Sequence, residues 1–376
     1  SETVGSILNR SVSDNYMYPM RYNDEHEITR YFDFTYISSD DFVKTADWGE
    51  RLRQSEADGI VFAVVPKKED ELDKIRVIIA EHALNNERIV FAVPRMFKDI
   101  EKIAYEYAAV IRLKSLVSED EQLSDEYDIY IEDLSEVLGS FHLAYSRPEN
   151  AAVNYYYGGV RRNLYRKAQL SSLLSQICED VFPHTPVINN EAINKNHLPT
   201  VAVNSRNKIL SGLLANHLEP NLGMTGTGQE VSMMRSTLIQ TGVLVNEDAQ
   251  ARLEMHPADA NMAHVLGIIE NFFAGANAGN GLSFAVLYEQ LTSPEYGIGL
   301  KSGVIPIYVA AVLHLCKNNL VIKYGDSETK ITADLLNSIN ENPQSYTVIM
   351  EDWNEDKARY MNALSELFAE YIVENE

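Results

Sequence analysis

The stretch GIVFAVV at residues 59–65 decides the fold, because it is a continuous apolar run closed by Pro66. Such a run is typical of a strand that is buried on both faces of a sheet. Residues 68–85 follow with apolar side chains at helical spacing, and RIVFAV at 88–93 predicts a second buried strand. A second helix is expected next, with a third strand at 110–113.

Strands joined by helices form right-handed parallel units, so we expect a small parallel β-α-β-α-β sheet in the first part of the chain. Its two halves resemble each other, since IVFAVVPKKEDELDKI at 60–75 matches IVFAVPRMFKDIEKI at 89–103 with a one-residue slip. The shared composition of buried strands also explains this likeness, and we favour it over a duplication. Upstream, YFDFTYIS at 31–38 carries further strand-forming residues.

The predicted fold class is α/β plus mostly α, in three parts. Residues 1–147 form the sheet unit with an acidic edge, and residues 148–280 form a helical middle region. Residues 281–376 are expected to be winged-helix-like, because helices precede a β-hairpin there, although one further helix and strand are additions to that plan. Residues 356–372 predict an acidic terminal helix with one apolar face.

The charge of the chain is strongly negative, with 32 Lys and Arg against 55 Asp and Glu. Such a surface repels duplex nucleic acid and anionic membranes unless its basic residues cluster. The sequence contains no run of 18 apolar residues that could span a membrane, and its first residues lack the pattern of a secretory signal. We therefore expect a cytoplasmic protein that does not bind a membrane. Because it begins without Met, we expect a processed product or part of a longer protein.

Phosphate-binding loops are not found in the sequence. The loop after the first buried strand, VVPKKEDE, has no glycine to bring backbone N–H groups to a phosphate, and GxxxxGK[ST] does not occur. The segment GMTGTGQE at 223–230 follows a helix and is interpreted as a flexible loop between helices. We therefore expect no nucleotide hydrolysis by these residues alone.

Nucleophile and metal motifs are equally sparse. Cys178 and Cys316 lie among apolar residues, as small buried thiols do, and two cysteines exclude a disulfide scaffold. His256 and His264 are two helical turns apart with Asp259 between them, but a third ligand is not evident. We therefore predict no catalytic residues, no metal and no cofactor.

Two oppositely charged segments follow one another. Residues 118–136 carry nine acids and no Lys or Arg, which we interpret as a solvated loop and helix face rather than a metal site. Residues 150–178 contain no acid, and YYYGGVRRNLYRK within them mixes tyrosines with cations. The predicted nucleic-acid or phosphate-binding residues are Arg161, Arg162, Arg166, Lys167, Tyr155, Tyr157 and Tyr165.

Tyrosine rings stack on bases, and Arg and Lys side chains follow a phosphate backbone. The alternative is a joining segment whose arginines pair with the acidic residues 118–136. Composition alone favours this alternative, because long-range repulsion from an acidic protein weakens binding of a polyanion.

Residues 187–353 resemble the region C-terminal to the ATPase domain in large bacterial P-loop proteins of phage-defence and restriction loci, including BREX-type ATPases. The segments that carry the resemblance are Asn190-Glu191 with Ile193-Asn194, Ala202 to Arg206, Gly226 to Ser232, and Gly299 to Gly303 with Pro306. The Walker motifs of such proteins are missing here. The resemblance therefore implies a non-catalytic coupling region of a large ATPase, which binds partner proteins and, through the basic cluster, nucleic acid.

Two other functions stay open. A stand-alone enzyme would bind a small anionic ligand between the middle helices, and its pocket would be built from Asn190, Glu191, Arg206, Glu230 and Arg235. Convergence of Arg206 and Arg235 in one cleft would favour that enzyme. Alternatively, an oligomerising scaffold would assemble through the helix at 356–372.

Overall fold

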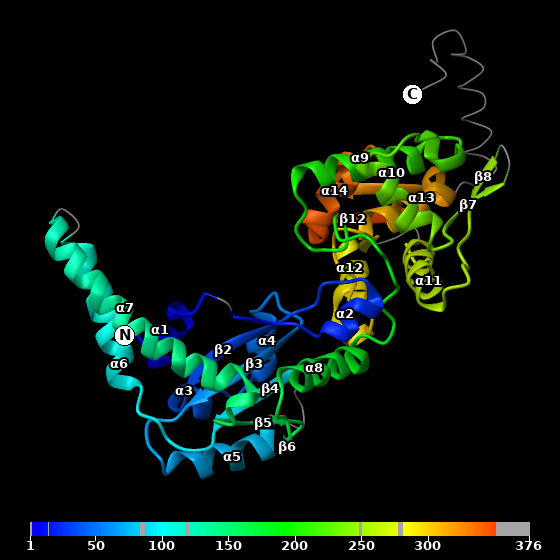
Figure 1. The fold of residues 1–376 in the computed structure, drawn as a ribbon. Coiled ribbons are helices and arrows are strands. Elements are labelled where there is room, and N and C mark those ends of the chain that lie inside the picture. Colours follow the sequence, from blue (N-terminus) through cyan, green and yellow to red (C-terminus); the bar gives the residue numbers. More distant parts are fainter. Residues whose placement is uncertain are drawn as a thin grey trace, which may run out of the picture. The chain divides into compact units, whose positions relative to one another are not determined.

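The computed structural model describes residues 2–13, 15–82, 87–117, 120–247, 250–276 and 281–350. They form two compact units (Figure 1). The first holds the residues up to Glu25 and Thr29–Val181, and the second holds His26–Ile28 and the chain from Phe182 onward. The division at Val181 falls inside the predicted helical region 148–280, so the start of that region belongs to the sheet unit.

The first unit combines helices with six strands. Its elements are α1 (Val4–Ser11), β1 (Tyr16–Met17), α2 (Met20–His26, whose last residue falls in the second unit), β2 (Phe32–Ser38), α3 (Ser39–Lys44), α4 (Trp48–Arg53), β3 (Gly59–Val65), α5 (Glu71–His82), β4 (Ile89–Pro94), α6 (Glu101–Leu116), α7 (Glu121–Ser146), β5 (Val153–Tyr157), β6 (Val160–Arg162) and α8 (Lys167–Val181).

One mixed sheet runs in the order β1-β2-β3-β4-β5-β6. Strands β2, β3 and β4 are parallel neighbours, and the strands on either side of them are antiparallel. The β-α-β-α-β unit therefore exists, but its strands are β2, β3 and β4. The strand-forming segment at 31–38 supplies its first strand, and the unit begins one strand earlier than the sequence indicated.

The predicted strand at 110–113 is wrong, because these residues lie within α6. Val110, Ile111 and Leu113 favour a strand locally. The helical pattern that starts with Ile103 and Tyr107 continues through them, however, and neither Gly nor Pro interrupts it. Helical periodicity over the longer segment therefore outweighs local strand propensity.

Both faces of the sheet are buried, as the apolar run at 59–65 predicts. Ile60, Phe62 and Val64 pack in one core with side chains of α3, α4 and α5, including Trp48. Helices α1 and α7 cover the opposite face (Figure 1). On that face the Tyr145 hydroxyl of α7 donates a 3.1 Å hydrogen bond to the carbonyl of Val64. The sheet is therefore the rigid centre of this unit.

The second unit is mostly helical. Its elements are α9 (Thr200–Leu214), α10 (Gln229–Met234) with a π-helical turn (Arg235–Ile239), β7 (Leu244–Glu247), β8 (Gln250–Leu253), α11 (Ala260–Ala274), β9 (Leu282–Ser283), α12 (Phe284–Thr292), α13 (Ile305–Cys316), β10 (Leu320–Tyr324), β11 (Ser327–Thr329), α14 (Ala333–Glu341) and β12 (Tyr346–Met350).

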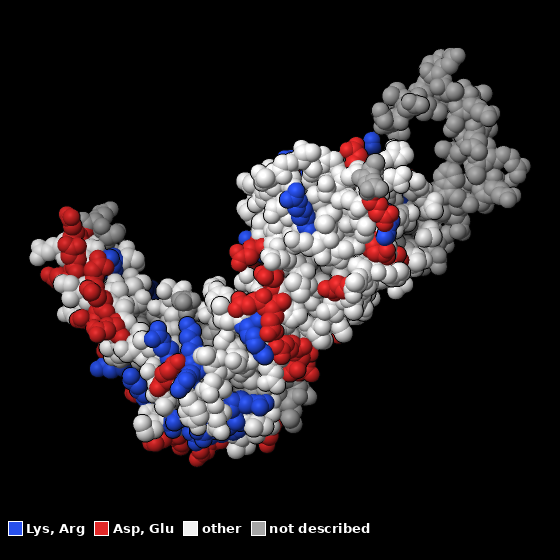
Figure 2. Space-filling view, turned by 45° about the vertical axis from the view of Figure 1, so that its right-hand side comes forward, with Lys and Arg blue, Asp and Glu red and all other residues white. Residues whose placement is uncertain are grey.

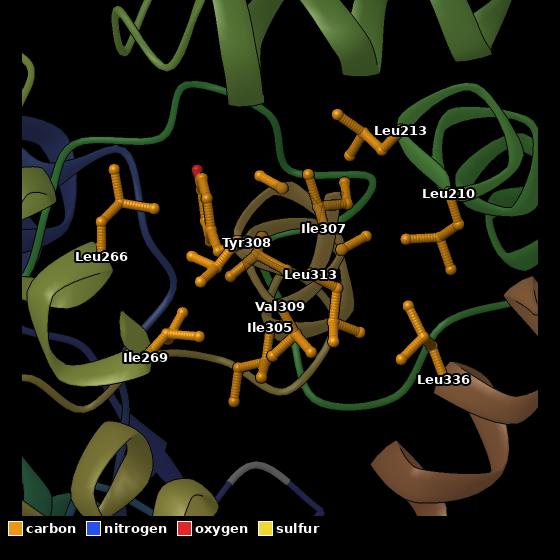
Figure 3. Close-up of a cluster of buried hydrophobic side chains, with 14 of the residues drawn as sticks. Leu210, Leu213, Leu266, Ile269, Ile305, Ile307, Tyr308, Val309, Leu313 and Leu336 are labelled. Atoms are coloured by element: carbon orange, nitrogen blue, oxygen red, sulfur yellow. The ribbon is translucent and has the colours of Figure 1, made fainter. Parts of the chain in front are cut away.

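Helix α13 is the centre of the second unit, and all nine residues from Ile305 to Leu313 are buried. Figure 3 shows Leu210 and Leu213 from α9, Leu266 from α11 and Leu336 from α14 directed toward this helix. The same core extends from Ile188 to Val348, so residues on both sides of the predicted boundary at 280/281 share it.

The C-terminal strands form an antiparallel sheet in the order β11-β10-β12-β9. Strands β10 and β11 form the predicted hairpin, whose turn begins at Gly325 with a positive φ of 57°. Helix α14 is capped by the Thr332 hydroxyl, which accepts a hydrogen bond from the N–H of Leu335. The predicted helix at 356–372 lies outside the described residues.

Candidate nucleic-acid interface

The β5–β6 hairpin places two predicted arginines at the edge of the six-stranded sheet. Gly158 and Gly159 form its two-residue loop with φ values of +60° and +73°, which a hairpin turn of this length requires. Strand β6 has one sheet neighbour, and all three of its residues are exposed. Arg161 and Arg162 therefore project into solvent, on opposite faces of the edge strand.

Two of the three predicted tyrosines serve the structure of this edge. Tyr155 is 1% exposed, and its hydroxyl donates a 2.7 Å hydrogen bond to the carbonyl of Tyr145, so its ring belongs to the core. Tyr157 is half-buried and donates to the carbonyl of Glu87, while the Arg162 guanidinium lies 5.4 Å from its ring centre. Tyr157 thus supports Arg162, and Tyr155 is removed from any surface site.

The start of α8 presents the remaining three predicted residues. Tyr165 is 58% exposed. The Gln169 side-chain oxygen accepts hydrogen bonds from the N–H groups of Tyr165 and Arg166, which fixes the backbone before the helix. The side chains of Arg166 and Lys167 are exposed. The local backbone is therefore ordered while its cationic groups face solvent.

The expected pairing of these arginines with the acidic stretch is not seen among the described residues. Arg161, Arg162, Arg166 and Lys167 have no carboxylate oxygen within 4.0 Å of their side-chain nitrogens there, whereas Asp128 of α7 pairs with Lys114 of α6. Glu149 accepts the backbone N–H of Lys167 at 2.6 Å, and this hydrogen bond, with Arg147 and Lys167 nearby, lowers its pKa. The basic cluster formed by Arg161, Arg162, Arg166 and Lys167 therefore keeps a net positive charge.

A cavity of about 760 Å³ lies beside the cluster within the first unit. Lys167 belongs to the basic cluster and also lines the cavity, together with Arg147 and Arg21. The sequence pattern alone did not join these two arginines to the cluster, because they are 14 or more positions away from Arg161. A signal was present in NYMYPMRY at residues 15–22, which joins aromatic residues to an arginine in the same way as the segment at 155–167.

The residues of the alternative ligand site have separate structural roles. Arg206 is 4% exposed and donates 2.8 Å hydrogen bonds to the carbonyl of Gly303 and to Asn337, while burial lowers its pKa. Arg235, in contrast, is exposed. The Arg206 guanidinium is therefore held by Gly303 and Asn337, whereas Arg235 lies at the surface.

The other three residues of that set have their own surroundings. Asn190 donates a 3.0 Å hydrogen bond to Ser236, and Glu230 forms a 2.7 Å ion pair with Lys208 near the surface. Glu191 lies exposed in the loop before α9. Neither cavity described in this section is lined by any of the five residues.

Three segments of the second unit meet around Gly303. Its N–H donates to the carbonyl of Lys195 at 3.0 Å, and its own carbonyl accepts from Arg206. A side chain at this position would lie 2.3 Å from the carbonyl oxygen of Ile193. The segments at 190–194, 202–206 and 299–303 therefore form a packed joint in the second unit.

A smaller cavity of about 180 Å³ lies where β2 and β3 end, the usual ligand position of parallel sheets. Its lining includes Lys44 and Lys67, but also five acids: Glu2, Asp40, Asp41, Asp99 and Glu101. Lys67 pairs with Asp40, which lowers the pKa of that carboxyl. This excess of carboxylates is unfavourable for a phosphate.

Metal and thiol chemistry find little support in the described part of the chain. No group of three or more His, Cys, Asp or Glu side chains there is arranged around a common point. Cys178 and Cys316 are free thiols, and burial raises the pKa of Cys316 to about 11, which keeps it protonated at neutral pH. Within the same residues, no helix is long and apolar enough to cross a lipid bilayer.

Comparison of the chain with family models, curated proteins and solved structures gives no significant match.

Proposed function

We propose that this chain is a non-catalytic interaction and coupling region of a large bacterial defence ATPase, and that it binds nucleic acid through the basic edge of the first unit. The observation that carries the nucleic-acid proposal is the cluster formed by Arg161, Arg162, Arg166 and Lys167 on β6 and the start of α8. These four exposed cations lie within residues 150–178, a segment that contains no acid although the whole chain has a net charge of −23.

The electrostatics of the first unit support this assignment. Figure 2 shows several Lys and Arg side chains, with some acidic ones among them, on the body of the first unit, whereas the charged side chains of the projecting α6–α7 hairpin are mainly acidic. Because the Debye length is about 8 Å at physiological ionic strength, acids beyond that distance are largely screened. A local excess of cations can therefore bind phosphates despite the net charge.

The C-terminal sheet of the second unit is the feature that supports the proposed coupling role. Strands β9, β12 and β10 are adjacent in the order that a winged helix uses, with β11 and α14 as an enlarged wing. In such a domain α13 would take the place of the DNA-reading helix, but its residues from Ile305 to Leu313 are buried. We therefore assign this winged-helix-like part to packing and partner contact rather than to DNA.

The test is fluorescence anisotropy of a labelled oligonucleotide of about 20 nucleotides at several salt concentrations. Four phosphate contacts predict a slope of about −3 for log affinity against log salt, at about 0.7 per contact for a single strand. Changing Arg161, Arg162, Arg166 and Lys167 to Glu should abolish this binding and its salt dependence. The matched control changes four other exposed cations of the unit to Glu, namely Arg51, Lys68, Lys74 and Arg112.

The control variant has the same net charge, so its unchanged affinity would assign the effect to the cluster. Equal loss in both variants would mean that only total charge matters, and unchanged binding in the cluster variant would remove the cluster from the function.

A second candidate function is protein binding by the α6–α7 hairpin, which projects from the first unit (Figure 1). No described residue of α7 before Leu138 is buried, although Ile129 and Tyr130 are 63% and 62% exposed. Leu116 at the end of α6 is 73% exposed. Apolar side chains on an acidic hairpin fit a partner surface that is basic and partly apolar.

A further inference from the structure

We propose that the cavity beside the basic cluster receives an unstacked base of single-stranded DNA or RNA, so that this edge prefers single strands to duplexes. This inference rests on the proposed nucleic-acid function and names its substrate class. It depends on three properties of the cavity: its aromatic wall, its cationic rim and its rigid frame.

The wall of the cavity offers aromatic rings to a ligand. Tyr16 and Tyr18 line it and are 52% and 42% exposed, so each has ring surface open to solvent. Phe34 and His142 also line the cavity, and their rings meet edge to face with centroids 5.2 Å apart. A volume of about 760 Å³ leaves room for a nucleotide unit. Exposed tyrosine rings stack on bases of any sequence.

The charge of the cavity suits a ligand that carries phosphate. Arg21, Arg147 and Lys167 line it, and none of the 18 described lining residues is Asp or Glu. Arg21 forms a 2.8 Å ion pair with Glu179 outside the cavity, while Arg147 and Lys167 have no such ion pair among the described residues. Arg166 precedes Lys167 in the chain. Phosphates held by the cluster would therefore lie next to the opening.

The cavity is held open by hydrogen bonds between its walls. The Ser171 hydroxyl of α8 accepts a 3.1 Å hydrogen bond from the N–H of Met20 and donates one of 2.7 Å to the carbonyl of Tyr18. The His142 ring of α7 lies within 3.1 Å of the Tyr36 hydroxyl on the sheet. These bonds connect the aromatic segment to α8 and α7 to the sheet, which gives a preformed site.

Only a single strand can use such a cavity without prior opening. Bases in a duplex are paired and stacked, so Tyr16 and Tyr18 can reach them only after a nucleotide has been extruded. A single strand offers a base to the cavity while neighbouring phosphates contact the cluster. The basic cluster alone would bind the phosphates of single strands and duplexes alike. The preference for single strands therefore comes from the cavity.

The test uses the full chain and oligonucleotides of one length as single-stranded DNA, single-stranded RNA and duplex DNA. The single strands carry 2-aminopurine, whose fluorescence reports stacking. The double variant Tyr16→Ser with Tyr18→Ser removes the rings, and Tyr16→Phe with Tyr18→Phe keeps them. We expect single strands to bind about tenfold more tightly than duplex, and the Ser variant to lose about that factor while its duplex affinity is unchanged.

The Phe variant should retain both the preference and the fluorescence change. Equal affinity for single strand and duplex, or a Ser variant with an unchanged preference, would overturn the role of the cavity while leaving the cluster as a binding site. Failure of the native chain to bind any of these oligonucleotides would overturn the proposed function itself.

Discussion

Gly303 lies where two backbone segments of the second unit come into contact. A Cβ atom at this position would lie 2.3 Å from the carbonyl oxygen of Ile193 and 2.6 Å from that of Lys195. Because both neighbours are backbone atoms, Gly303→Ala should force the segments apart and destabilise the unit by about 1–3 kcal/mol. Thermal unfolding followed by circular dichroism measures this change.

Gly139 in α7 is the matched control, because a Cβ there would meet no atom within 4 Å. In the interior of an exposed helix, Gly139→Ala should instead stabilise the first unit by about 0.5–1 kcal/mol. A Gly303→Ala protein as stable as the native chain would show that the joint yields easily. The close contact at Gly303 would then contribute little to the stability of the second unit.

Arg206 shows how far single residues could be predicted. As a cation beside apolar helices, Arg206 is predicted from the sequence to bind an anion, whereas in the structure it is buried and donates to the carbonyl of Gly303. Its spacing did carry information, since Ala202, Ile209 and Leu210 are buried on the same face of α9. A helical wheel could have predicted the burial. The partners Gly303 and Asn337 could not be predicted, because they depend on tertiary packing.

At the scale of elements, the buried strands were predictable and their order was not. The runs at 59–65 and 89–93 are long enough to identify β3 and β4 without knowledge of their neighbours. Strand β2 has buried and half-buried residues in partial alternation, a weaker signal. Strand β5 joins the sheet after the α6–α7 hairpin, so its pairing with β4 depends on a contact far away in the sequence.

The α6–α7 hairpin leads to a prediction at this scale. Leu116 at the end of α6 and Ile129 in α7 are exposed, so Leu116→Ser with Ile129→Ser should change the free energy of unfolding by no more than about 0.5 kcal/mol. The same variant should weaken binding of a basic partner protein, measured by calorimetric titration with the products of neighbouring genes. Val77→Ser with Met96→Ser is the control, since these apolar residues are exposed elsewhere in the unit.

A marked loss of stability in the hairpin variant would mean that Leu116 and Ile129 pack inside the protein. Equal partner affinity in the hairpin and control variants would remove the hairpin from partner binding.

At the scale of the whole molecule, one buried position in each unit can be substituted to report the stability of that unit alone. In the first unit, Arg30 is 1% exposed and donates a 2.6 Å hydrogen bond to Asp58. Burial opposes the charge of Arg30, but the attraction of Asp58, Tyr22 and Cys178, together with the hydrogen bond to Asp58, outweighs burial and raises its pKa. Asp58→Ala would leave the buried guanidinium without this carboxylate, which should cost about 3–5 kcal/mol. Gly303→Ala is the corresponding marker for the second unit.

Calorimetric unfolding of the chain should resolve two transitions, because the two compact units each have a core of their own. Asp58→Ala should lower the midpoint of one transition, and Gly303→Ala should lower the midpoint of the other. Because Ile188 and Val348 belong to one core, residues 182–280 should unfold together with 281–350. A third transition, unmoved by Gly303→Ala, would instead restore a domain boundary near residue 280 and make the shared core a contact between separate domains.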